Sequence, residues 1–163
     1  MNKYIEQNMR YVAVAGGFND ETQTITMGML QFNEEENKEF VLQFPKSLNE
    51  QYLQSKRIAG EIYATMSAIN QAIKDNIPNI TILYHYVGVE RWATGEWQAE
   101  AEVAKRYLKY LEQAQKYIQI QYLKIDREDE DYQQLKDKTE LLAETINETN
   151  KWVYLEEKNT VNV

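Results

Sequence analysis

The chain has 163 residues and a formal net charge of -8, with 26 Asp and Glu against 18 Lys and Arg, and this length fits one domain with its own core. It has no cysteine and one histidine, His85, which excludes disulfide frameworks, thiolate metal sites, cysteine nucleophiles and sites that need two imidazoles. No stretch approaches the roughly 18 apolar residues of a membrane span. The first ten residues are polar and lack a signal-peptide core. We therefore expect a cytoplasmic protein without a membrane partner, whose abundant reactive groups are carboxylates.

Three short runs near the N-terminus have the composition of β-strands. The first is β-branched and ends at Gly16-Gly17, with turn-forming Asn19-Asp20 after it. The other two alternate apolar and polar residues, which is typical of strands in an antiparallel meander. The three expected strands are residues 11–15, 24–32 and 40–44.

The pattern then changes to alternating helices and strands. Apolar residues recur every three or four positions in three stretches, which predicts amphipathic helices. Between them lie two runs rich in β-branched residues, the first so continuously apolar that it predicts a buried, parallel strand. The expected helices are 55–74, 100–116 and 132–146, and the expected strands are 80–86 and 118–125.

The predicted order is therefore β-β-β-α-β-α-β-α, which indicates an α/β chain with a five-stranded mixed sheet flanked by helices. We expect an N-terminal extension at 1–10, one domain at 11–146 and a C-terminal tail at 147–163. The apolar group 152–155 has no place in that minimal order, so the tail is expected to add a strand or a helix, or to contact a partner.

Three segments resemble the ribonuclease H-like family. Residues 13–19 resemble the first strand of that family, which usually has Asp-Gly-Ser where this chain has Ala-Gly-Gly, and residues 57–62 resemble the helix that carries a catalytic glutamate. Residues 82–97 are similar to the bacterial ribonuclease H pattern Tyr-Asp-Tyr-x-Gly-Ile-x-x-Trp-x-x-Gly-x-Trp. The resemblance covers roughly 11–146 and implies the ribonuclease H-like fold. It also implies cleavage of RNA in RNA–DNA hybrids by two divalent cations that four carboxylates hold.

The resemblance places the four carboxylate positions at Ala15, Glu61, His85 and Asp137. Alanine offers no ligand, and a neutral imidazole suits Zn²⁺ or Mn²⁺ better than Mg²⁺. Glu61 and, by a loose match, Asp137 remain as metal ligands if a remnant site survives. Because two carboxylates of four are replaced, we expect no catalytic residue and no cofactor, with Mg²⁺ or Mn²⁺ only in an active alternative. A single histidine in an apolar strand is also typical of a hydrogen-bonded core residue.

Two further groups are candidate binding residues. Trp92 and Trp97 could stack on bases, although packing around a tight turn is the favoured interpretation. Asp126, Glu128 and Asp129 belong to an acidic run that lacks the glycine and distant glutamate of a calcium loop, which favours a solvated loop.

We therefore expect a pseudoenzyme, a catalytically degenerate ribonuclease H-like domain that acts by binding. What it binds is a protein partner, a small ligand, or a nucleic acid held without cleavage. The charge of -8 favours a protein partner with a basic surface over nucleic acid. One alternative is an active nuclease in which Asp20, Asp126 or Asp129 replaces the lost ligands. The other is a structural or oligomeric component that uses 152–155.

Overall fold

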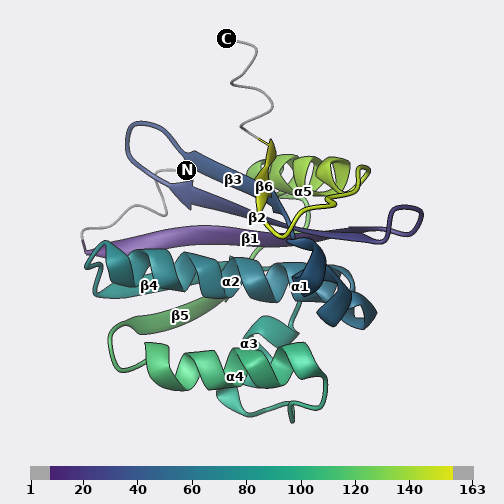
Figure 1. Ribbon diagram of the computed structural model, residues 1–163. Helices are drawn as coiled ribbons and strands as arrows, with labels where there is room; N and C mark the ends of the chain where they lie inside the picture. Colours follow the sequence, from purple (N-terminus) through teal and green to yellow (C-terminus); the bar gives the residue numbers. More distant parts are fainter. Residues whose placement is uncertain (1–7, 156–163) are drawn as a thin grey trace.

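The protein is described by a computed structural model over residues 8–155. It contains a six-stranded mixed sheet in the order β5-β4-β1-β2-β3-β6 (Figure 1). Strands β1, β2, β3 and β6 pair antiparallel, whereas β4 pairs parallel with both β1 and β5. The strands are β1 (Met9–Asn19), β2 (Thr24–Phe32), β3 (Lys38–Gln43), β4 (Asn79–Tyr84), β5 (Gln119–Lys124) and β6 (Val153–Tyr154).

Helices cover both faces of this sheet. The long helices α2 and α4 lie on one face, with the short helices α1 and α3 beside them, and α5 lies on the other face (Figure 1). The expected order of three strands followed by alternating helices and strands is confirmed. The helices are α1 (Lys46–Gln51), the 3-10 turn η2 (Leu53–Ser55), α2 (Arg57–Lys74), α3 (Gly88–Thr94), α4 (Glu102–Ala114) and α5 (Glu130–Leu142).

Strand β1 runs farther than the sequence predicts, because it continues through Gly16 and Gly17 instead of ending there. The two glycines allow close packing on opposite faces of the sheet. A β-carbon on Gly16 would overlap the carbonyl oxygen of Arg57 on α2, and one on Gly17 would overlap the hydroxyl of Thr26. The glycines therefore lie where a helix crosses the sheet at short range. From the sequence alone, the same glycine pair predicts a turn.

Two apolar cores lie on the two faces of the sheet. The larger core joins α2 and α4 to the sheet, with Ile62, Ile69 and Tyr107 fully buried in it. The smaller core joins α5 to the other face through Ala15 and Leu135. Burial of apolar area at roughly 25 cal/mol per Å² is the main force that holds both layers together.

The C-terminal tail adds a sixth strand to the five expected from residues 11–146, and an added strand is one of the roles expected for the tail. Val153 and Tyr154 pair with the end of β3 as β6, and the preceding Trp152 ring packs edge-on against Phe44 at a centroid distance of 5.1 Å. Asn147 fixes the approach to β6, since its Nδ2 donates to the carbonyl oxygens of Phe44 and Lys151. Much of the group 152–155 therefore packs within this chain; the rest of the tail, 156–163, lies outside the described residues.

Strand β1 begins at Met9, inside the segment expected to be an N-terminal extension. Met9 and Arg10 pair with Asn79 and Ile80 of β4, and Arg10 forms an ion pair with Asp75 at 2.8 Å. Within residues 8–155, none of the helices combines the length and apolar character that a membrane crossing requires.

Candidate functional site

The candidate site lies where β4 ends beside a longer β1. The parallel register pairs Ala13 with Leu83, and β4 stops one residue later at Tyr84. Continuing that register by two residues sets His85 level with Ala15. Beyond this point the edge of β1 is not covered by β4, and the N-terminal end of α2 and the helix α5 approach it from opposite faces.

Glu61 closes the end of β4. It lies on α2 with 6 % of its surface exposed, and its Oε2 accepts hydrogen bonds from the backbone N–H groups of His85 and Tyr86, each at 3.0 Å. Burial raises the pKa of Glu61 to about 7, against the opposing effect of the two N–H donors and of Lys124. The carboxylate therefore holds the turn after β4.

His85 lies just beyond β4 and is half-buried, so the prediction of a core residue inside a buried strand is wrong. Its ring stacks on Tyr132 of α5, with centroids 5.6 Å apart and planes at 21°. Burial lowers the pKa of His85, and the positive charges of Lys124, Arg127 and Lys136 lower it further. The neutral imidazole is therefore favoured near neutral pH.

Asp137 does not join the other predicted positions. Helix α5 turns Tyr132, Leu135 and Thr139 toward the sheet, and at 100° per residue Asp137 lies on the opposite, exposed side. The structure therefore brings Ala15, Glu61 and His85 together and leaves Asp137 in solvent. Asp137 belongs to no cluster of three metal-binding side chains within residues 8–155, and its role as a ligand beside Glu61 stays a prediction.

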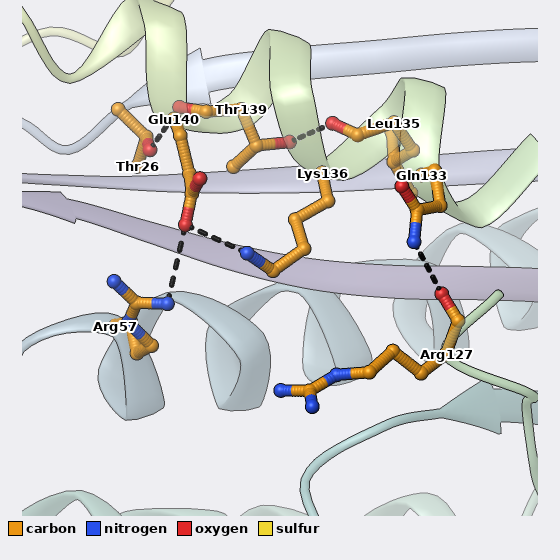
Figure 2. A network of polar contacts seen from close by, with 8 residues as sticks. All are labelled: Thr26, Arg57, Arg127, Gln133, Leu135, Lys136, Thr139 and Glu140. Atoms are coloured by element: carbon orange, nitrogen blue, oxygen red, sulfur yellow. Dashed lines mark hydrogen bonds and ion pairs between the residues drawn. The ribbon is translucent and has the colours of Figure 1, made fainter.

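Cations occupy the side of α5 that faces this edge. The Oε2 of Glu140 accepts from Arg57 of α2 at 3.1 Å and from Lys136 at 3.0 Å, so one carboxylate oxygen is shared by two positive groups. Figure 2 shows the Arg57 and Lys136 side chains reaching Glu140 from below and from α5, while the Arg127 side chain extends toward the same region.

Lys124 and Arg127 complete this group, which we call the cation cluster; its members are Arg57, Lys124, Arg127 and Lys136. Lys124 ends β5, and its Nζ donates to the carbonyl oxygen of His85 at 3.1 Å. Arg127 follows in the loop to α5, where its own carbonyl oxygen accepts from Gln133 at 2.8 Å. Among the described residues, the Arg127 guanidinium has no hydrogen-bond or ion-pair partner.

This arrangement does not fit the two divalent cations that ribonuclease H chemistry needs. Of the four predicted positions, Glu61 alone supplies a carboxylate near the edge of β1, and one of its oxygens already accepts two backbone hydrogen bonds. Across residues 8–155, no three His, Cys, Asp or Glu side chains gather closely enough to hold a metal ion. The positive cluster would also repel Mg²⁺ or Mn²⁺, so no reaction step is assigned to a metal here.

The other candidate residues have structural contacts. Trp92 is 8 % exposed; its ring packs edge-on against Trp97 at 6.0 Å, and Tyr86 packs against both rings. Asp129 caps α5, since its Oδ1 accepts from the N–H of Tyr132 at 3.0 Å.

The remaining acids of the loop before α5 lie close to that cap. Asp126 accepts from the N–H of Glu128 at 2.9 Å, and the Glu128 side chain is exposed.

Sequence reasoning missed Arg57, Lys124, Arg127 and Lys136 because they lie far apart along the chain. A signal does exist for two of them. The carboxyl ends of parallel strands meet at one edge of a sheet, so the residues just after strands are candidate ligand contacts. For the predicted strand 80–86, this rule indicates the residues around His85. For the predicted strand 118–125, it indicates Lys124 and Arg127.

No family model matches the chain, and no curated protein matches it. Solved structures do match. The N-terminal RNase H domain of Rv2228c from Mycobacterium tuberculosis, solved as a fusion with maltose-binding protein, superposes with a TM-score of 0.64 at 11% identity, covering 83% of this chain and 96% of that chain.

Two further structures give the same result. RNase H1 from the halophilic archaeon Halobacterium salinarum NRC-1 superposes with a TM-score of 0.61 at 11% identity, over 83% of this chain and 96% of its own. LC11-RNase H1 in complex with an RNA/DNA hybrid gives a TM-score of 0.61 at 10% identity, over 83% and 99%. The strand order, the helices on both faces and these superpositions agree: the chain has the ribonuclease H-like fold.

Proposed function

We propose that this chain is a nucleic-acid-binding domain that does not cleave by the metal-dependent route of ribonuclease H. The observation that carries the proposal is the composition of the site: alanine and histidine stand at two carboxylate positions, and Glu61 is engaged by the turn after β4. The cation cluster surrounds these residues where cleavage would need anionic ligands.

Nucleic acid is favoured as the ligand for two reasons. One of the similar structures, LC11-RNase H1, is a complex with an RNA/DNA hybrid. In addition, the negative total charge of this chain hides a local excess of cations at the end of β4, and local potential governs an encounter with phosphate more than net charge does. A protein partner with a basic surface stays a prediction for the acidic remainder of the surface.

The alternative of an active nuclease needs new ligands from Asp20, Asp126 or Asp129. Asp129 has one oxygen on the first turn of α5, and Asp126 has one on the N–H of Glu128. Asp20 is exposed in the turn between β1 and β2. None of the three belongs to a cluster of three metal-binding side chains within the described part of the chain. The site composition thus favours binding over cleavage.

The test is an assay of a labelled RNA–DNA hybrid with wild type and Glu61→Gln, in Mg²⁺ and in Mn²⁺. We expect both proteins to bind the hybrid and to leave its RNA strand intact. The matched control is Glu102→Gln, which removes an exposed carboxylate of α4. Metal-dependent cleavage that Glu61→Gln abolishes and Glu102→Gln retains would establish the nuclease alternative instead. Failure of wild type to bind any hybrid would refute the nucleic-acid assignment.

A further inference from the structure

The members of the cation cluster come from three parts of the fold near the end of β4. Arg57 comes from α2 and Lys136 from α5, on opposite faces of the sheet, while Lys124 and Arg127 come from the end of β5 and the loop after it. Figure 2 shows the Arg57 and Lys136 side chains meeting at Glu140 between α2 and α5, with the Arg127 side chain below them. The arrangement concentrates positive charge in a chain whose total charge is -8.

We propose that the cation cluster binds phosphate groups of a nucleic acid backbone directly, in the place where a metal site would lie, with no intervening metal ion. This inference deepens the proposed function and rests on it, because it names the atoms that contact the ligand. Guanidinium groups suit this task, since their paired N–H donors match two phosphate oxygens.

The charge balance leaves the cluster free to accept an anion. Within residues 8–155, Glu140 is the carboxylate that forms ion pairs with the cluster, and it meets two of the four cations, Arg57 and Lys136. Glu61 is buried with a pKa raised to about 7, so it offsets little of the cluster's positive charge below neutral pH. Lys124 Nζ meets a neutral carbonyl oxygen and keeps its other N–H groups for a ligand.

The acidic residues next to Arg127 accept hydrogen bonds from the local backbone. Asp126 and Asp129, on either side of Arg127, accept from the N–H groups of Glu128 and Tyr132. Glu128, Glu130 and Asp131 continue the acidic run away from the end of β5, and the first two are exposed. These acids limit how far a negative backbone can extend over the loop, so the ligand is expected to approach between α2 and α5.

The cluster is accessible. The Arg57 side chain is 53% exposed and that of Lys136 is 31% exposed, and Lys124 and Arg127 are exposed as well. An incoming phosphate therefore displaces mainly water. It can draw Arg57 or Lys136 partly from Glu140, because an exposed ion pair contributes at most about 1 kcal/mol.

The pKa of His85 can be used to follow phosphate binding to the cation cluster. It is the single histidine of the chain, and three members of the cluster depress its pKa. A phosphate bound among them would offset their charge and raise the pKa of His85. The Cε1–H resonance of one imidazole can be followed without assignment of the rest of the spectrum.

The experiment compares wild type with the double variant Arg127→Gln, Lys136→Gln. The matched control is Lys105→Gln, Lys109→Gln, which removes the same charge from exposed positions on α4. Near-ultraviolet circular dichroism verifies that all three proteins are folded. The first arm measures affinity for an RNA–DNA hybrid in EDTA at several salt concentrations, and the second titrates inorganic phosphate while the His85 resonance is recorded.

We expect the cluster variant to bind the hybrid at least tenfold more weakly, with the slope of log K against log salt reduced by about 1 to 2. The control should change by less than threefold. If both variants lose hybrid affinity equally, or the cluster variant loses none, the inference is overturned. Hybrid binding by wild type would in that case still uphold the proposed function.

The second arm separates the remaining case. If wild type binds no hybrid, the proposed function fails. A phosphate-dependent rise of the His85 pKa in wild type and control, lost in the cluster variant, would then still establish direct phosphate binding, by a ligand other than this hybrid. No response of His85 to phosphate in that case would overturn the inference.

Discussion

At the scale of single residues, Glu61 has structural contacts at a position where the ribonuclease H resemblance predicts a metal ligand. Its carboxylate is buried and accepts two backbone hydrogen bonds at the end of β4. Such contacts satisfy N–H groups that would otherwise be left without partners where the ladder stops. A structural role of this kind explains a glutamate here without any metal.

The pH dependence of stability tests this role. The pKa of Glu61 is raised from 4.5 to about 7 in the folded chain, so the protonated form stabilises the fold. That stability is complete below pH 4.5 and is lost as the pH rises through about 7. By chemical denaturation, Glu61→Gln should match wild type near pH 4 and exceed it by up to about 3 kcal/mol near pH 8.

The control for this measurement is Glu102→Gln, which removes an exposed carboxylate. Its stability should follow that of wild type across the range. A constant difference between Glu61→Gln and wild type at all pH values would contradict the raised pKa.

The histidine gives a second test at this scale. Lys136→Gln removes one of the charges that depress the pKa of His85, so that pKa should rise toward its ordinary value. Lys138→Gln is the control, because Lys138 lies two residues along α5 and pairs with Glu39 instead. An NMR titration of the single imidazole measures both; equal shifts in the two variants would argue against a local effect of the cluster.

At the scale of elements, the helix–strand crossing depends on the absence of side chains. Gly60 of α2 lies against β2, where a β-carbon would overlap the carbonyl oxygen of Thr26, and Gly16 of β1 lies against the same helix. This crossing sets the position of Glu61, the next residue of α2. The geometry of the site therefore rests on two glycines that carry no chemistry.

Gly60→Ala tests the crossing. Alanine is the better helix former by about 1 kcal/mol, but the overlap is with backbone that cannot move aside, so a net loss of about 1–3 kcal/mol or more is expected. Gly95→Ala is the comparison: it meets no neighbouring atom but has a φ of +84°, which costs roughly 1–2 kcal/mol. Urea unfolding ranks the two, and a Gly60→Ala protein as stable as wild type would refute the close crossing.

The C-terminal strand offers a test against the oligomer interpretation. Trp152 packs against Phe44 and lies 6.4 Å from the ring of Tyr63, so Trp152→Ala should lower the free energy of unfolding by about 2–3 kcal/mol. Tyr154→Ala, at an exposed position, should lower it by less than 1 kcal/mol. Light scattering should find the same mass for both variants and wild type; a smaller mass for Trp152→Ala would support an intermolecular role instead.

At the scale of the whole molecule, the order and type of the secondary-structure elements could be predicted from periodicity. The meeting of the cation-cluster residues at one place could not. The spacing of Ile58, Ile62 and Ile69 predicted α2, and the apolar run before His85 predicted a buried parallel strand. The cation cluster combines residues from α2, β5, a loop and α5, so it exists through tertiary packing alone. The apolar group 152–155 left a strand, a helix and a partner contact open, and the packing of Trp152 on Phe44 accompanies strand β6.

The charge of the molecule is also distributed in a way that composition conceals. Lys and Arg are outnumbered by Asp and Glu, which led to the expectation of a basic protein partner. The fold nevertheless gathers four cations near the end of β4 and leaves the predicted ligand Asp137 exposed on α5. A net charge describes solubility and long-range repulsion, whereas a ligand meets a local surface.

We propose that this chain, with its ribonuclease H-like fold, holds a nucleic acid on cations instead of cleaving it with metals. The most direct measurement incubates one labelled RNA–DNA hybrid with wild type in Mg²⁺ and in EDTA, and follows both the bound fraction and the length of the RNA. We expect binding in EDTA as well as in Mg²⁺, with full-length RNA in both. Shortened RNA in Mg²⁺ alone, or binding that EDTA abolishes, would contradict the proposal.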